Sequence, residues 1–159
     1  MEGSRLVAPL TAAKLDPAAP SHEIQQLWFA LRRKEWSSLA VIAVEPNTSA
    51  RFIAEGLAAV GELHRGVPVK LVNGEGATVA ASSRLAVALS THVAAGAMAI
   101  AVLDSVVENQ AGIPVALTAD AILLAVSLRR SKRSSLERTL ELLGKDRVLG
   151  TVAIRPHGT

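Results

Sequence analysis

The stretch LAVIAVEPNTSARFIAEGLAAVGELHRG, residues 39–66, decides the fold. It begins with an apolar, β-branched run over 39–44, passes through a polar turn, and enters a helical pattern set by Ile53, Leu57 and Val60. The predicted order is therefore strand, loop and helix. In nucleotide-binding α/β proteins the first such loop is rich in glycine, because glycine lets successive backbone N–H groups surround a phosphate. The loop of this chain contains no glycine and no lysine.

Composition predicts one globular domain built around parallel strands. The chain has 159 residues, of which half are hydrophobic, so it is long enough for one real core. With two Phe, two Trp and no Tyr, this core must consist mainly of Val, Leu, Ile and Ala, which suits strands buried on both faces. No cysteine is present and the four His are scattered, so we expect neither disulfides nor a metal site.

Apolar runs and helical periodicity alternate through the rest of the chain. A first helix is predicted from a Ser21 cap, with Ile24, Leu27, Trp28 and Leu31 on its buried face. A later helix is predicted to start at Ser134, which has the capping-box spacing to Glu137. Further strands are predicted at 67–72, 98–103, 121–128 and 147–154, with helices at 78–95 and 134–143 and a loop with a short helix at 105–118. This alternation predicts a three-layer α/β/α fold with a mostly parallel sheet of five or more strands.

The N-terminal residues differ in composition from the predicted domain that follows them. Residues 1–20 contain three prolines and no lasting periodicity, which predicts a flexible N-terminal arm before a single α/β domain at 21–156. The start has no signal-peptide pattern, and the uncharged run 85–102 is interrupted by polar residues and glycine. We therefore expect a cytoplasmic protein.

Two groups of residues are candidates for binding a partner. Trp28 and Phe29 are neighbours on a helix and point about 100° apart, so one of them is expected to face outward; the alternative is that both pack on the sheet. The second group is a basic patch, for which the alternatives are an ordinary solvated loop and a site for nucleic acid or an anionic membrane. It consists of Arg129, Arg130, Lys132 and Arg133.

Asp104 follows the predicted strand 98–103 directly. The carboxyl end of a strand is where α/β sheets bind ligands, and in nucleotide hydrolases an Asp at this place orients magnesium. The alternative is that Asp104 begins a turn or caps a helix, which Asp often does.

Several segments together resemble a known family. They are LAVIAV, FIAEGLAAVGELHRG, VPVKLV, AIAVLD and the C-terminal ADAILLAVSLRRSKRSSLERTLELLGKDRVLGTVAI. In their order and amino-acid sequence they are similar to the cytoplasmic kinase domain of bacterial polysaccharide co-polymerases, the bacterial tyrosine kinases. More broadly, they resemble the ParA and MinD group of deviant P-loop ATPases. The resemblance covers residues 21–154 and implies a P-loop NTPase-like fold.

The chain departs from this family where the family carries its chemistry. The family's phosphate loop ends in Gly-Lys-Ser or Gly-Lys-Thr, and this chain has EPNTSAR instead. The resemblance assigns Asn47, Thr48, Ser49 and Arg51 to degenerate phosphate-loop positions, with Thr48 or Ser49 in the place of the magnesium-binding hydroxyl and Arg51 as a substitute for the lysine. Asp104 keeps a vestigial acidic position. Further along, NGE at 73–75 replaces an acidic motif, Gln26 and Phe29 replace the arginines of the oligomerisation helix, and the tyrosine-rich tail is absent.

These departures predict a pseudo-enzyme without catalytic residues, cofactor or tight nucleotide binding. The first hypothesis is a non-catalytic pseudo-ATPase or pseudokinase-like module that acts through protein–protein interaction or self-association, in a bacterial envelope polysaccharide, secretion or positioning system. The alternatives are an unorthodox ATPase that uses Arg51, and a binder of nucleic acid or membrane surfaces that uses the patch at 129–133.

Overall fold

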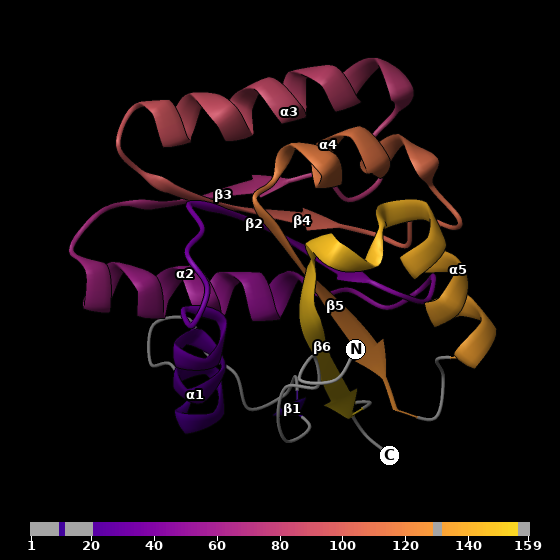
Figure 1. The fold of residues 1–159 in the computed structure, drawn as a ribbon, viewed down its shortest axis with the longest axis horizontal. Coiled ribbons are helices and arrows are strands. Elements are labelled where there is room, and N and C mark those ends of the chain that lie inside the picture. The colour runs from indigo at the N-terminus through magenta and orange to yellow at the C-terminus, as the bar shows by residue number, and fades with distance from the viewer. Residues whose placement is uncertain (1–9, 12–20, 129–131, 156–159) are drawn as a thin grey trace.

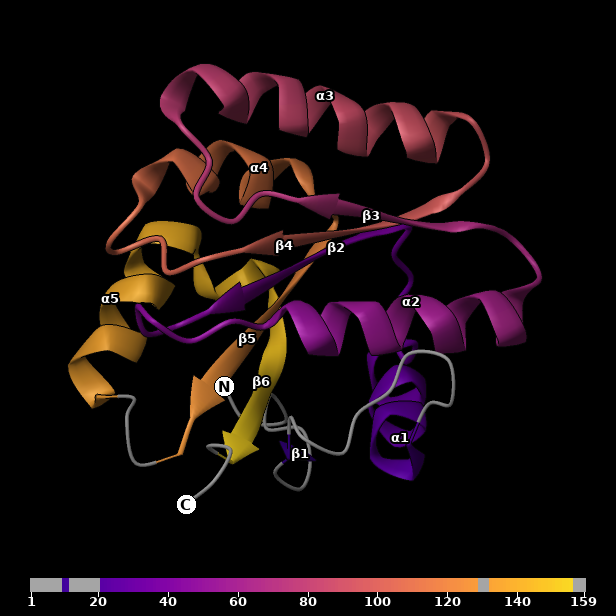
Figure 2. The same cartoon turned by 180° about the vertical axis from the view of Figure 1, so that it is seen from behind.

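A sheet of parallel strands lies between two layers of helices (Figures 1 and 2). The computed structural model describes residues 10–11, 21–128 and 132–155. Within these residues six strands follow the order β1-β6-β5-β2-β4-β3, and every pair is parallel. The strands are β1 (Leu10–Thr11), β2 (Ser38–Ala43), β3 (Val69–Asn73), β4 (Met98–Leu103), β5 (Ala121–Ser127) and β6 (Val148–Arg155).

Helices cover both faces of the sheet. Helices α1 and α2 pack on one face, and α3, α4 and α5 pack on the other (Figures 1 and 2). Their bounds are α1 (His22–Leu31), α2 (Arg51–Arg65), α3 (Val79–Ala94), α4 (Ile113–Thr118) and α5 (Arg133–Leu143), with 3₁₀ turns η2 (Gln110–Gly112) and η3 (Lys145–Arg147). The expected three-layer α/β/α architecture with a parallel sheet is thereby confirmed.

Strand β2 lies in the middle of the sheet, between β4 and β5. Leu39 and Val41 point into the core beneath α1 and α2, whereas Ala40 and Ile42 point into the core beneath α3 and α4. All four side chains are fully buried. A strand that is buried on both faces needs apolar residues at every position, which explains the unbroken apolar run.

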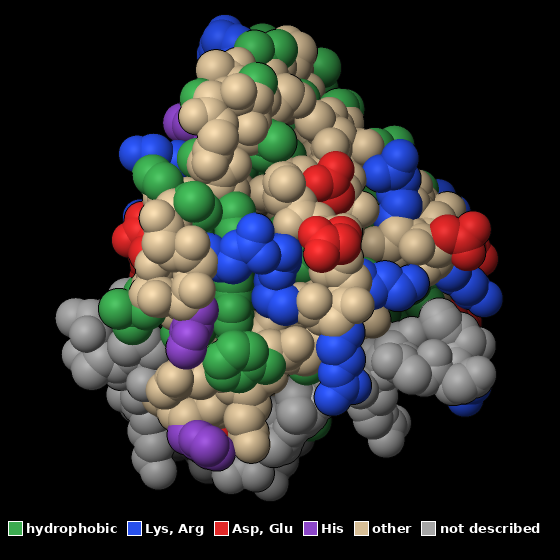
Figure 3. All heavy atoms as spheres, turned by 60° about the vertical axis from the view of Figure 1, so that its left-hand side comes forward, with side chains coloured by type: hydrophobic (Ala, Val, Ile, Leu, Met, Phe, Trp, Pro, Cys, Tyr) green, Lys and Arg blue, Asp and Glu red, His purple; other side chains and the backbone are tan. Residues whose placement is uncertain are grey.

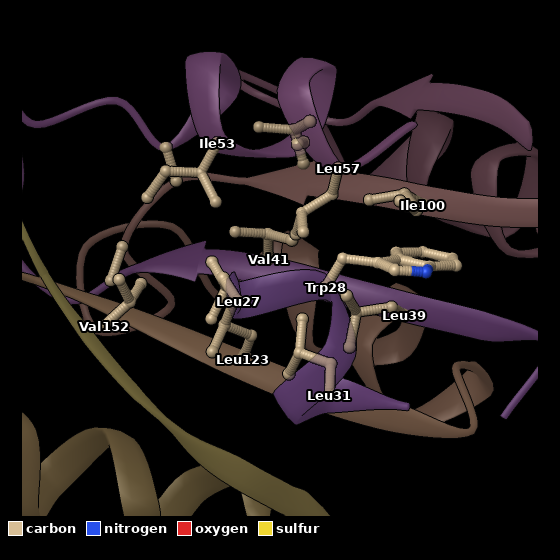
Figure 4. Packing of buried hydrophobic residues seen from close by; sticks show 14 of the residues in the cluster. Leu27, Trp28, Leu31, Leu39, Val41, Ile53, Leu57, Ile100, Leu123 and Val152 are labelled. Atoms are coloured by element: carbon tan, nitrogen blue, oxygen red, sulfur yellow. The ribbon is translucent and has the colours of Figure 1, made fainter. Parts of the chain in front are cut away.

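Helices α1 and α2 approach each other closely above the sheet. Leu27 and Trp28 of α1 and Leu57 of α2 converge there with residues of the strands (Figure 4). At Gly61 of α2 an added Cβ would lie 2.8 Å from the ring of Trp28. This glycine therefore gives the indole the room that it occupies.

Two of the helices begin at side-chain caps. The Ser21 hydroxyl accepts a hydrogen bond from the backbone N–H of Ile24 at 3.2 Å, as the sequence predicts. The Thr78 hydroxyl accepts one from the backbone N–H of Ala81 at 3.1 Å. Both bonds satisfy donors that the first turn of a helix leaves without a partner.

The predicted capping box of Ser134 and Glu137 is wrong. Helix α5 begins at Arg133, and no side chain caps it. The preceding residue, Lys132, is extended, and its backbone N–H donates to the Glu45 carboxylate at 2.7 Å. A hydrogen bond between segments far apart in the sequence thus holds the residue before the helix, and Ser134 lies within the first turn.

Strand β1 lies within the predicted N-terminal arm, where no strand was expected. Leu10 pairs with Ile154 and Thr11 with Arg155 at the edge of the sheet. The rest of that arm, residues 1–9 and 12–20, lies outside the described residues. In the described part of the chain no helix has the length and apolar content that crossing a membrane requires.

Candidate functional site

The carboxyl end of β2 is the place where an α/β sheet of this topology binds ligands. After β2 the chain runs through α2 to β3 at the edge, returns through β4, and then crosses β2 to reach β5 on its other side. The connections therefore leave in opposite directions around β2, and such a switch point opens a crevice beyond the strand ends. The loops that follow β2, β3, β4 and β5 meet at this edge.

Residues at the N-terminus of α2 form hydrogen bonds with one another and with the loop after β3. The Ser49 hydroxyl accepts a hydrogen bond from the backbone N–H of Arg51 at 3.2 Å and donates one to the Glu75 carboxylate at 2.7 Å. The backbone N–H groups of Ile53 and Ala54 donate to the carbonyl of Ala50. Of the N–H groups in the first turn of α2, those of Arg51 and Ile53 thus have partners within the protein.

Arg51 does not extend toward the loop as a substitute for a phosphate-binding lysine. Its Nε lies 3.2 Å from Glu55 Oε2, one turn further along α2, and about half of the side chain is exposed. This i,i+4 pair neutralises the cation on the surface of its own helix. The i,i+4 spacing of Arg51 and Glu55 is visible in the sequence, but this contact was not among the predictions.

Glu45 connects two loops of the site. Its carboxylate accepts the backbone N–H of Lys132, so the β2–α2 loop is joined to the loop between β5 and α5. Pro46 follows it and has no backbone donor. Asn47 is exposed with a φ of 64°, and Thr48 is half-buried. The loop thus presents a carboxylate where a phosphate-binding loop presents N–H groups.

Asp104 organises the turn beyond β4. One carboxylate oxygen accepts the backbone N–H of Gly76 at 3.0 Å, and the other lies 3.5 Å from the side-chain amide of Asn109. The same amide donates to the carbonyl of Ala77 at 3.0 Å. Asp104 therefore bridges the loops after β3 and β4, through a contact between distant segments that neither interpretation of the sequence predicts.

The partners Asn109 and Glu75 were not among the residues predicted for the site. Neither stands in a recognisable motif. Each contacts a segment more than 25 residues away in the chain, and such a contact cannot be predicted from local sequence. Within the described residues, no group of three or more His, Asp or Glu side chains is placed to hold a metal ion. The buried hydroxyl of Ser105 has no hydrogen-bond partner among the described atoms.

The two aromatic candidates of α1 point in different directions. Trp28 is 1% exposed and meets the ring of Trp36 edge-on, with centroids 5.7 Å apart. Phe29 is 53% exposed, and its ring lies 4.9 Å from that of His64. One residue thus faces inward and the other outward, as the helical spacing predicts.

The predicted basic patch is only partly described. Lys132 and Arg133 are exposed, and Arg133 forms an ion pair with Glu137 at 3.3 Å. Arg129 and Arg130 lie outside the described residues. The structure therefore brings together the β2–α2 loop and Asp104 at one edge of the sheet, with Lys132 bound to that loop.

Comparison with known proteins identifies the fold. No protein-family model matches the chain, and no curated protein sequence matches it. The crystal structure of the chimerical protein CapA2B2 superimposes with a TM-score of 0.68 and 12% sequence identity, over 89% of this chain and 88% of that chain. At this identity the likeness shows a related fold, and it extends over nearly the whole of both chains.

Proposed function

We propose that this chain is a catalytically silent pseudo-ATPase module, with a P-loop NTPase-like fold, that acts by binding another protein or a second copy of itself. The observation that carries the proposal is the β2–α2 loop. Its carboxylate is bound to Lys132, its serine caps Arg51, and Arg51 is paired with Glu55. The glycines and the lysine of a phosphate-binding loop are absent, and the backbone N–H and side chain of Arg51 have partners within the protein.

The chemistry of phosphoryl transfer explains why the composition of the β2–α2 loop argues against catalysis. Catalysis of that reaction depends on backbone donors and cations held at the phosphate oxygens. Glu45 places a negative charge at the same loop instead, and repulsion between a carboxylate and a triphosphate costs roughly 1 kcal/mol or more, depending on burial. A domain with this loop retains the frame of a nucleotide site without its binding groups.

Both the fold and the sequence support a role in a larger assembly. The chain shares its architecture with CapA2B2, and its segments resemble the bacterial tyrosine kinases and the ParA and MinD group. We propose a cytoplasmic module of a bacterial envelope polysaccharide, secretion or positioning system, with Phe29 on the contact surface. The ATPase alternative gains less support, because Arg51 is paired with Glu55 of its own helix.

A phosphate-release assay tests the catalytic part of the proposal. We expect the full chain with magnesium and ATP to release phosphate at the rate of buffer alone. Turnover above that background that disappears in Arg51→Ala would overturn the proposal and support an unorthodox ATPase. Lys145→Ala, which changes an exposed cation of η3, serves as the matched control.

A further inference from the structure

The carboxyl ends of α1 and α2 meet on one side of the molecule and carry a concentration of cations. Figure 3 shows this side, where Lys and Arg side chains gather beside hydrophobic and His side chains. We call it the α1–α2 end surface. It consists of Phe29, Arg32, Arg33, Lys34, His64 and Arg65.

The positive charge of this surface is largely uncompensated. Arg33, Lys34 and Arg65 are exposed, and none of them forms an ion pair with a residue that the structure describes. Arg32 has a lowered pKa, chiefly because of burial and secondly because Arg65 is near, whereas Glu35 acts in the opposite direction. The Glu35 side chain is almost fully exposed and lies 4.0 Å from Arg32, so it offsets the cluster only in part.

The apolar part of the surface is held in place. The Phe29 ring is fixed against His64, and the Arg32 guanidinium lies over the rings of Trp36 and Trp28 at 4.8 and 5.8 Å. Arg32 also donates to the carbonyl of Trp36 at 2.6 Å. An exposed aromatic ring beside an arginine is a composition typical of binding hot spots.

A structural role at the helix ends explains only some of these residues. Cations near a helix C-terminus interact favourably with the helix dipole, and this accounts for Arg65 in the last turn of α2. Arg33 and Lys34 follow the end of α1, and neither contributes an ion pair or a described side-chain hydrogen bond to the fold. The exposed ring of Phe29 gains nothing from a dipole.

We infer that the α1–α2 end surface binds an acidic protein segment that contains an apolar or aromatic side chain. The apolar side chain packs on Phe29, and the carboxylates of the segment face Arg33, Lys34 and Arg65. Charge complementarity selects an anionic occupant. The exposed Leu63 next to His64 adds a second apolar side chain, and apolar contacts favour a peptide over a polyphosphate chain, which has no apolar group to place there. The inference rests on the proposed protein-binding function and names its class of partner.

The test uses a fluorescein-labelled peptide with a central Leu-Phe pair flanked by glutamates, measured by fluorescence anisotropy with the full chain. We expect binding that weakens as salt rises. The double variant Arg33→Glu, Lys34→Glu should lose at least about tenfold in affinity, and Phe29→Ala about fivefold or more. The matched control Arg138→Glu, Lys145→Glu makes the same change of charge on α5, which covers the other face of the sheet, and on the η3 turn after it, and should bind as the unchanged protein does.

Three results would overturn the inference: no binding of the peptide up to about millimolar concentration, an equal loss in the control variant, or tighter binding of a single-stranded oligonucleotide than of the peptide. Circular dichroism checks the fold of each variant, and Arg33→Gln, Lys34→Gln replaces a charge-reversed variant that does not fold. An ATP titration of the same protein tests separately whether the chain binds nucleotide. Failure of the peptide-binding inference is therefore distinguishable from failure of the proposed function.

Discussion

At the scale of single residues, Trp28 and Phe29 are neighbours in the chain with different environments. Trp28 belongs to the apolar face that also includes Leu27 and Leu31, and it fills the core between α1, α2 and the sheet. Phe29 lies about 100° further around the helix, and half of it remains exposed. The helical period predicts this division, because the other residues of the apolar face define which of the two points inward.

Substitution of each aromatic residue by alanine should separate stability from association. We expect Trp28→Ala to lower the free energy of unfolding by about 3–5 kcal/mol, since it leaves a cavity in the core. Phe29→Ala should change it by less than about 1 kcal/mol and weaken binding to a partner or a second copy. Guanidinium denaturation and sedimentation velocity measure the two effects. A comparable loss of stability in both variants would show that Phe29 belongs to the core.

Gly61 offers a second test of the same core. Gly61→Ala brings a Cβ to 2.8 Å from the Trp28 ring, so one helix must shift, and we expect a loss of about 1–3 kcal/mol. Gly112→Ala is the control, because an added Cβ there meets its nearest neighbours at ordinary contact distance, 3.6 Å. Equal stability of the two variants in urea would contradict the close packing of α1 on α2.

At the scale of elements, the described strands and helices of 21–155 follow from apolar runs and helical periodicity. The strand Met98–Leu103 begins and ends at the predicted residues, and the other predicted boundaries differ by a few residues. The interaction that precedes α5 and the strand β1 could not be predicted. The residue before α5 is held by Glu45, and β1 exists through its pairing with β6; both depend on contacts between distant segments.

Helix caps test this difference between local and distant determinants. Thr78→Ala removes the hydrogen bond at the start of α3 and should cost about 1 kcal/mol of stability. Ser134→Ala should have an effect near zero, because Ser134 makes no cap bond in α5. Both are measured as changes in the midpoint of thermal unfolding. A larger shift for Ser134→Ala than for Thr78→Ala would show that Ser134 caps α5 after all.

At the scale of the whole molecule, the candidate site was partly predictable. The absence of glycine and lysine between β2 and α2 is visible in the sequence, and so is the position of Asp104 after a strand. The closure of the site was not predictable, because the bonds of Glu45 to Lys132 and of Ser49 to Glu75 join loops that come together only in the folded sheet. These two bonds of the β2–α2 loop thus form only in the folded protein.

Isothermal titration with ATP and magnesium tests the central claim most directly. Because the loop before α2 contains neither glycine nor lysine and Arg51 pairs with Glu55, we predict no binding below about millimolar concentration. Lys145→Ala should give the same result as the unchanged chain. A micromolar dissociation constant that is lost in Arg51→Ala and kept in Lys145→Ala would contradict the account, since Arg51 would then have left Glu55 to bind phosphate.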